Sequence, residues 1–61
     1  MTDKLRDFEQ YLRLQVKESD RLAFASSARH DSTDADKWRA VADAYATCYT
    51  RLFGELKREE L

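Results

Sequence analysis

The chain contains almost nothing that interrupts a helix. Its 61 residues include no proline and a single glycine, Gly54, and these two residue types break helices most strongly. Turn-forming residues gather in one segment, 26–34, which divides the chain nearly in half. The sequence therefore predicts one helix over about residues 3–28, a turn over about 29–33 and a second helix over about 34–60.

Capping residues mark the start of each predicted helix. Thr2 precedes the first helix and Thr33 the second, and a threonine hydroxyl at such a position accepts a hydrogen bond from a free backbone N–H. Asp36 follows Thr33 at the spacing of a capping box. Leu56 continues the apolar face of the second helix, so we expect Gly54 to be tolerated within it at a cost of about 1 kcal/mol relative to alanine. The alternative is that Gly54 ends the helix and leaves a frayed, charged tail.

Apolar residues recur at helical spacing in both halves. The face of the first half is interrupted by polar residues and consists of Leu5, Phe8, Leu12, Gln15, Ser19, Leu22 and Ser26. The second half has a wider apolar sector, which consists of Trp38, Val41, Ala42, Tyr45, Ala46, Cys48, Tyr49, Leu52, Phe53 and Leu56. At about 100° per residue this sector covers roughly 160° of the helix, which is more than one neighbouring helix buries.

The width of that sector predicts self-association. We expect the half around Val41, Cys48 and Leu52 to pack against the first helix. The other half is predicted to form a dimer interface, and it consists of Ala42, Ala46, Tyr49 and Phe53. The predicted fold is all-α: an antiparallel two-helix hairpin that pairs with a second copy as a homodimeric four-helix bundle. The alternative is that the extra apolar surface covers a loop or a tail.

Small size favours the same conclusion. Domains below about 70–80 residues seldom build a sufficient core alone and use disulfides, a structural metal or association. Cys48 is the only cysteine and cannot form an internal disulfide, and no zinc-ligand spacing is present. Association is the remaining means of stabilisation.

No residue pattern indicates catalysis or a bound cofactor. His30, Asp31, Asp34 and Asp36 are the one cluster with metal-ligating side chains, but their spacing matches no calcium loop, and a turn followed by a helix start requires the same residue types. Cys48 has no histidine at helical spacing, so we expect a buried small hydrophobe rather than a nucleophile. We predict no catalytic residues, no metal and no cofactor.

One face of the first helix is basic. The candidate surface for a partner or for nucleic acid consists of Arg6, Gln10, Arg13, Leu14, Lys17, Arg21 and Phe24. Such cations bind phosphates with a steep salt dependence. A mixed charged face is also typical of a surface that is merely solvated, and Glu9 pairs favourably with Arg13.

The whole-chain charge limits the partner classes. Lys and Arg number 11 and Asp and Glu 12, for a net charge of −1, which does not favour nucleic-acid binding through a global field. No apolar run approaches the roughly 20 residues that span a bilayer, and no export signal is visible. We therefore expect a cytoplasmic, non-enzymatic interaction module that binds itself and another protein, with no membrane partner. The alternative is an RNA- or DNA-binding regulator that uses the basic face.

Overall fold

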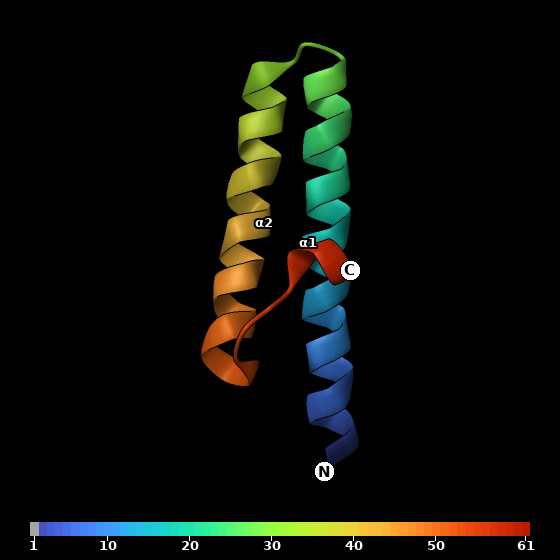
Figure 1. Ribbon diagram of the computed structural model, residues 1–61, viewed down its shortest axis with the longest axis vertical. Helices are drawn as coiled ribbons and strands as arrows, with labels where there is room; N and C mark the ends of the chain where they lie inside the picture. Colours follow the sequence, from blue (N-terminus) through green and yellow to red (C-terminus); the bar gives the residue numbers. More distant parts are fainter. Residues whose placement is uncertain (1) are drawn as a thin grey trace.

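Two long helices form an antiparallel hairpin in the computed structural model, which describes residues 2–61 (Figure 1). α1 covers Thr2–Ala28, α2 covers Ser32–Phe53 and a short 3-10 helix, η1, covers Arg58–Glu60. α1 and α2 pack against each other, so the predicted all-α helical hairpin is confirmed. The molecule is a rod of 44 × 17 × 16 Å. The capping role predicted for Thr2 falls on a side chain outside the described residues.

A residue in the left-handed conformation ends α1. His30 has φ 61°, a region in which histidine is enriched relative to most non-glycine residues. The N–H groups of His30 and Asp31 donate to the carbonyl oxygens of Ser27 and Ser26, at 3.0 and 2.9 Å. These two bonds form a Schellman motif, which satisfies the last free carbonyls of the helix.

Asp31, and not Thr33, caps α2. The Asp31 carboxylate accepts a hydrogen bond from the backbone N–H of Asp34 at 3.1 Å, so α2 begins at Ser32, earlier than predicted. Asp34 in turn accepts a hydrogen bond from the hydroxyl of Ser26 at 2.7 Å. This contact joins the end of α1 to the start of α2. The predicted cap was wrong because Thr33 already lies inside the first turn of the helix.

The core of the hairpin is small and rich in alanine. Its buried apolar residues are Leu12, Val16 and Ala23 from α1 and Ala35, Ala42 and Tyr49 from α2. The three α2 residues recur every seven positions, which places them on one stripe of the helix. Alanine side chains let two helix backbones approach closely.

Four residues of the apolar sector of α2 have the opposite burial from the prediction. Ala42 is completely buried and Tyr49 is buried, whereas Cys48 is exposed and Leu52 is 61% exposed. The expectation that Cys48 and Leu52 would face α1 is therefore wrong, whereas Val41, the third residue of that half, is half-buried. The short turn holds the two helices close together, and the stripe with the small residues fits that separation better than the stripe with the larger ones.

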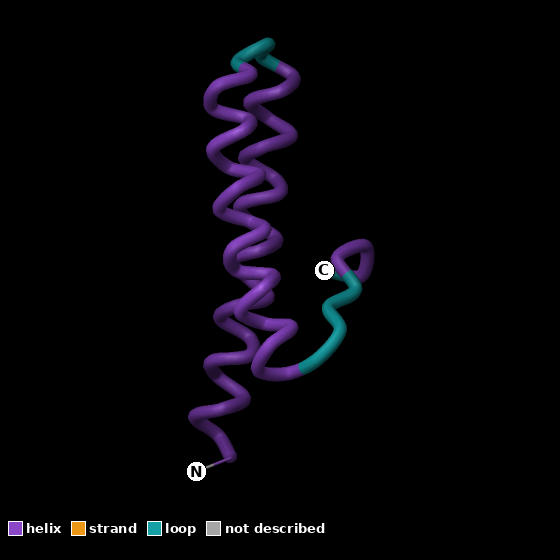
Figure 2. Tube along the Cα trace, turned by 90° about the vertical axis from the view of Figure 1, so that its left-hand side faces the viewer, coloured by secondary structure: helices purple, strands orange, loops and turns teal. Residues whose placement is uncertain are grey.

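Gly54 ends α2, so the prediction of a helix to about residue 60 is wrong beyond Phe53. Gly54 has φ 99° and ψ −163°, a combination that only glycine adopts readily. Its N–H still donates to the carbonyl oxygen of Thr50 at 3.1 Å. Residues 54–61, which we call the strap, then fold back along the hairpin and include η1 (Figure 2).

Candidate interaction surfaces

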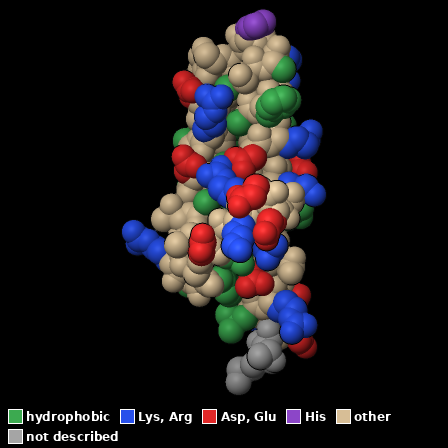
Figure 3. Space-filling view, viewed as in Figure 1, with side chains coloured by type: hydrophobic (Ala, Val, Ile, Leu, Met, Phe, Trp, Pro, Cys, Tyr) green, Lys and Arg blue, Asp and Glu red, His purple; other side chains and the backbone are tan. Residues whose placement is uncertain are grey.

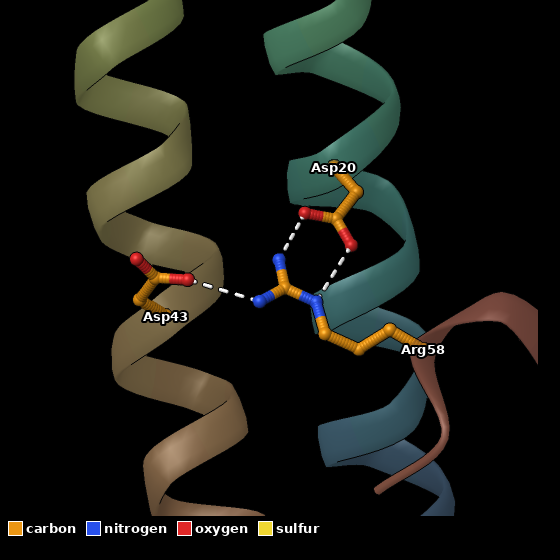
Figure 4. Close-up of polar contacts among 3 residues, drawn as sticks. All are labelled: Asp20, Asp43 and Arg58. Carbon is orange, nitrogen blue, oxygen red and sulfur yellow. Dashed lines mark hydrogen bonds and ion pairs between the residues drawn. The ribbon is translucent and has the colours of Figure 1, made fainter.

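Arg58 of the strap joins three parts of the molecule. Its Nε donates a hydrogen bond to Oδ2 of Asp20 at 3.1 Å, its Nη2 donates to Oδ1 of Asp20, and its Nη1 donates to Oδ1 of Asp43 at 2.9 Å (Figure 4). Asp20 lies on α1 and Asp43 on α2. A bidentate arginine–carboxylate pair is among the stronger polar contacts in proteins. The strap is therefore tied to both helices through one side chain.

The charges around Arg58 favour its ionised form. Hydrogen bonding to Asp20 is the largest cause and raises the pKa of Arg58 above its ordinary value, and Asp43 raises it further. Partial burial acts in the opposite direction. Because arginine is already ionised throughout the neutral range, Arg58 holds the strap at any pH in that range. Sequence reasoning missed this contact because it placed Arg58 on a continuing helix.

The strap also covers part of the apolar sector of α2. Tyr49 and Arg13 border a cleft of about 230 Å³ whose other walls come from the strap residues Glu55, Leu56, Lys57 and Glu60. For this part of the sector the alternative of a covering tail is correct. The tail is not frayed, because Arg58 anchors it. Figure 3 shows charged side chains of both signs on the face where the strap lies.

The opposite side of the hairpin carries an apolar surface. Tyr45 lies about 160° around α2 from Asp43, the residue that Arg58 holds, because successive helix positions differ by about 100°. Residues at steps of three and four share its stripe. We define the open side as Phe8 and Tyr11 of α1 with Trp38, Val41, Tyr45, Cys48 and Leu52 of α2. Within residues 2–61 no other element lies over this side (Figure 2).

Aromatic rings connect the two helices on the open side. The rings of Tyr11 and Tyr45 meet edge to face with centroids 6.4 Å apart, and Phe8 lies 6.3 Å from Phe53. The side chain of Tyr11 is the main cause that raises the pKa of Tyr45 above its ordinary value. Tyr11 and Phe8 nevertheless stay 48% and 43% exposed. Large aromatic side chains on a surface of this kind are typical of interaction sites.

The four residues predicted as a dimer interface do not form one outward surface. Ala42 and Tyr49 are buried inside the hairpin, and Ala46 and Phe53 are half-buried. Phe53 contacts Tyr49, with ring centroids 5.3 Å apart. The apolar surface that remains includes Cys48 and Leu52, which the sequence pattern predicts to contact α1.

The predicted basic surface lies along the outer face of α1. Arg6, Gln10, Leu14, Lys17, Arg21 and Phe24 are exposed and Arg13 is half-buried. Phe24 is 78% exposed and Leu14 is 53% exposed. Arg21 forms an ion pair with Glu18 at 2.9 Å. A cleft of about 240 Å³ lies between this face and the strap, and it is lined by Gln10, Arg13, Leu14, Lys17, Glu60 and Leu61.

The acidic cluster near the turn has structural contacts. Asp31 caps α2, Asp34 accepts from Ser26, and Asp36 lies 3.4 Å from Arg39. His30 supplies the left-handed residue. The side chains described, those of residues 3–61, contain no group of three or more His, Cys, Asp and Glu placed to hold a metal ion.

Comparison with known proteins adds no assignment. No protein-family model matches the chain, and the searches of curated proteins and of solved structures found no match. Over residues 2–61, neither helix is long and apolar enough to cross a membrane.

Proposed function

We propose that the chain is a small, non-enzymatic protein-interaction module that acts as a homodimer. In this proposal two hairpins pair through their open sides and form a four-helix bundle. The observation that carries the proposal is the position of the open side: its aromatic and aliphatic side chains gather on the side of the hairpin opposite the strap. A twofold contact of this kind uses the same residues on both copies.

The exposed area supports a pairing surface of standard size. The chain exposes 4761 Å², whereas a compact monomer of 7.2 kDa exposes about 4,100 Å² by the usual scaling with mass. The excess is comparable to the roughly 800 Å² that each partner buries in a stable protein interface. Covering the open side would bring the exposed area per chain close to that of a compact protein.

The composition of the core favours a second copy over an unrelated partner. Three of the six buried apolar residues are alanines, and a buried alanine contributes little hydrophobic free energy compared with a leucine or phenylalanine. The core of a single hairpin therefore contributes little hydrophobic free energy, and a second layer adds to it. Another copy of the same chain is always present at the concentration of the first.

Charge substitutions on the two sides of the rod test the dimer. Leu52→Glu places a carboxylate on the open side, and burying it without a partner in both copies costs several kcal/mol. We expect the association constant measured by sedimentation to fall by a factor of about 100 or more. Because Leu52 is exposed in the hairpin, the same change costs a monomer little.

Leu14→Glu is the matched control. Leu14 has similar exposure, 53% against 61%, but lies on the outer face of α1. We expect this variant to keep the mass of the dimer. If Leu52→Glu leaves the dimer unchanged, or if both variants change the association constant equally, the open side is not the dimer interface.

A further inference from the structure

The outer face of α1 has a chemical character that the dimer does not use. Its cations Arg6, Arg13 and Lys17 recur at steps of seven and four, so they share one stripe of the helix. Phe24 and Leu14, on the same face, are among the most exposed large apolar residues of the chain. A surface that combines cations with exposed apolar side chains is complementary to a segment that carries carboxylates beside apolar residues.

The strap already places such a segment on this face. Glu60 and Leu61 line the cleft of about 240 Å³ together with Gln10, Arg13, Leu14 and Lys17. Glu60 also borders the neighbouring cleft beside Arg13. An acidic residue followed by a leucine therefore lies over cations and a leucine of α1. The chain itself therefore places an acidic residue and a leucine beside this face.

We propose that the outer face of α1 binds an acidic, leucine-containing segment of a partner protein, and that the strap is a built-in competitor for the same site. This gives the interaction module proposed above its class of partner and rests on that function. An intramolecular competitor acts at an effective concentration in the millimolar range. The partner segment must therefore displace Glu60 and Leu61, and the Arg58 contacts with Asp20 and Asp43 set how readily the strap leaves.

A protein segment fits this face better than a nucleic acid. Phosphate backbones satisfy cations but leave Leu14 and Phe24 without an apolar partner. Arg21, the fourth cation of the face, is already paired with Glu18.

Fluorescence anisotropy with a defined peptide tests the proposal. The probe is a labelled peptide of three Glu-Glu-Leu repeats, and the control peptide has every Glu replaced by Gln. We expect the full-length chain to bind the acidic peptide weakly and Arg58→Ala to bind it about ten-fold more tightly, because the competitor is released. The control peptide is expected to bind neither.

Charge reversal locates the site. Lys17→Glu in the Arg58→Ala background is expected to abolish peptide binding. Arg51→Glu in the same background reverses an exposed cation of α2 and is expected to leave binding unchanged. Equal binding of the Glu and Gln peptides, absence of binding to Arg58→Ala, or equal loss in both charge variants would each overturn the proposal.

Two further readings separate the alternatives. A labelled single-stranded RNA and a DNA duplex of about 20 nucleotides are titrated in parallel, and binding of either one in place of the peptide, with a steep fall in salt, would replace the proposal with a nucleic-acid site. The mass of each sample is measured by sedimentation. A dimer that binds no peptide refutes this inference alone, whereas a monomer that binds the peptide refutes the dimer alone.

Discussion

On one side of the hairpin the strap crosses both helices and Arg58 holds it to Asp20 and Asp43. On the other side Tyr11 and Leu52 are exposed, with no element of residues 2–61 over them. The first side is completed by contacts that each chain makes alone, whereas in the proposed dimer the second side is completed by the other copy. The proposed pairing therefore makes stability on the open side depend on protein concentration, whereas stability on the strap side is independent of it.

The largest expected difference between the sides is in thiol reactivity. Cys48 is exposed in the hairpin but belongs to the open side, so pairing covers it. We expect its reaction with a disulfide reagent to be slower by about ten-fold or more well above the dimer dissociation constant than after dilution below it. The measurement is the reaction rate as a function of protein concentration.

The neighbouring residue supplies the control for that experiment. Thr47 lies on the strap side, where it lines a cleft with Asp43 and Arg58. A Thr47→Cys chain that also carries Cys48→Ser is expected to react at one rate at all concentrations. A constant rate for Cys48 itself would mean that the open side stays uncovered.

Loss of the Arg58 contacts is expected to have a smaller effect that does not depend on concentration. Arg58→Ala removes the bidentate pair with Asp20 and the bond to Asp43, and it frees the strap from Tyr49. Because these groups are partly exposed, we expect the free energy of unfolding to fall by about 1–2 kcal/mol. Urea unfolding at a low and a high protein concentration is the measurement.

Arg58→Lys keeps the charge but not the fork-shaped donor set. It should recover less than half of the lost free energy. If the stability lost in Arg58→Ala increases on dilution, the Arg58 contacts do not form within a single chain.

The turn provides a change that belongs to neither side. Asp31→Ala removes the cap of α2, which we expect to cost about 1 kcal/mol of stability, whereas Thr33→Ala should change stability by only a few tenths of a kcal/mol. The measurement is thermal unfolding, with the dimer mass expected to be unchanged in both variants. A larger loss of stability for Thr33→Ala than for Asp31→Ala would show that Thr33 is the N-cap of α2.

The smallest expected effect is on the titration of Tyr45. The side chain of Tyr11 raises the pKa of Tyr45. The contribution of this pair to stability is therefore complete below the ordinary tyrosine pKa of about 10 and is lost as the pH rises through the raised value. Ultraviolet absorbance should show this tyrosine ionising late. In Tyr11→Phe its pKa should return toward the ordinary value, and an unchanged titration would exclude the pair.

Helix content and the hairpin could be predicted because they follow from local rules. The absence of proline and the single cluster of turn residues determine where helix is interrupted. Local rules could not predict which stripe of α2 packs against α1. Ala42 and Leu52 belong to one wide apolar sector, and which of them is buried depends on how closely α1 approaches. The pattern contained both candidates, and alanine's small size at residues 35 and 42 was the signal that favoured the buried stripe.

The strap could not be predicted from periodicity. Leu56 follows Leu52 by four residues, so the pattern is compatible with a continuous helix, and only the backbone conformation of Gly54 separates the two outcomes. The contact of Arg58 with Asp20 joins residues far apart in sequence, and no local spacing indicates it. The residues of the basic surface of α1, by contrast, could be identified from their helical spacing alone. The position of Glu60 and Leu61 beside that surface could not be predicted from spacing.

Sedimentation equilibrium of the unmodified chain tests the central claim most directly. The samples cover about 1 to 100 μM, the range in which a modest interface of this size dissociates. The helicity of the same samples is measured by circular dichroism. We predict a mass of twice 7.2 kDa at the upper end, and on dilution a shift to the single-chain mass with loss of helicity. A fully helical particle of 7.2 kDa throughout the series would contradict pairing through the open side.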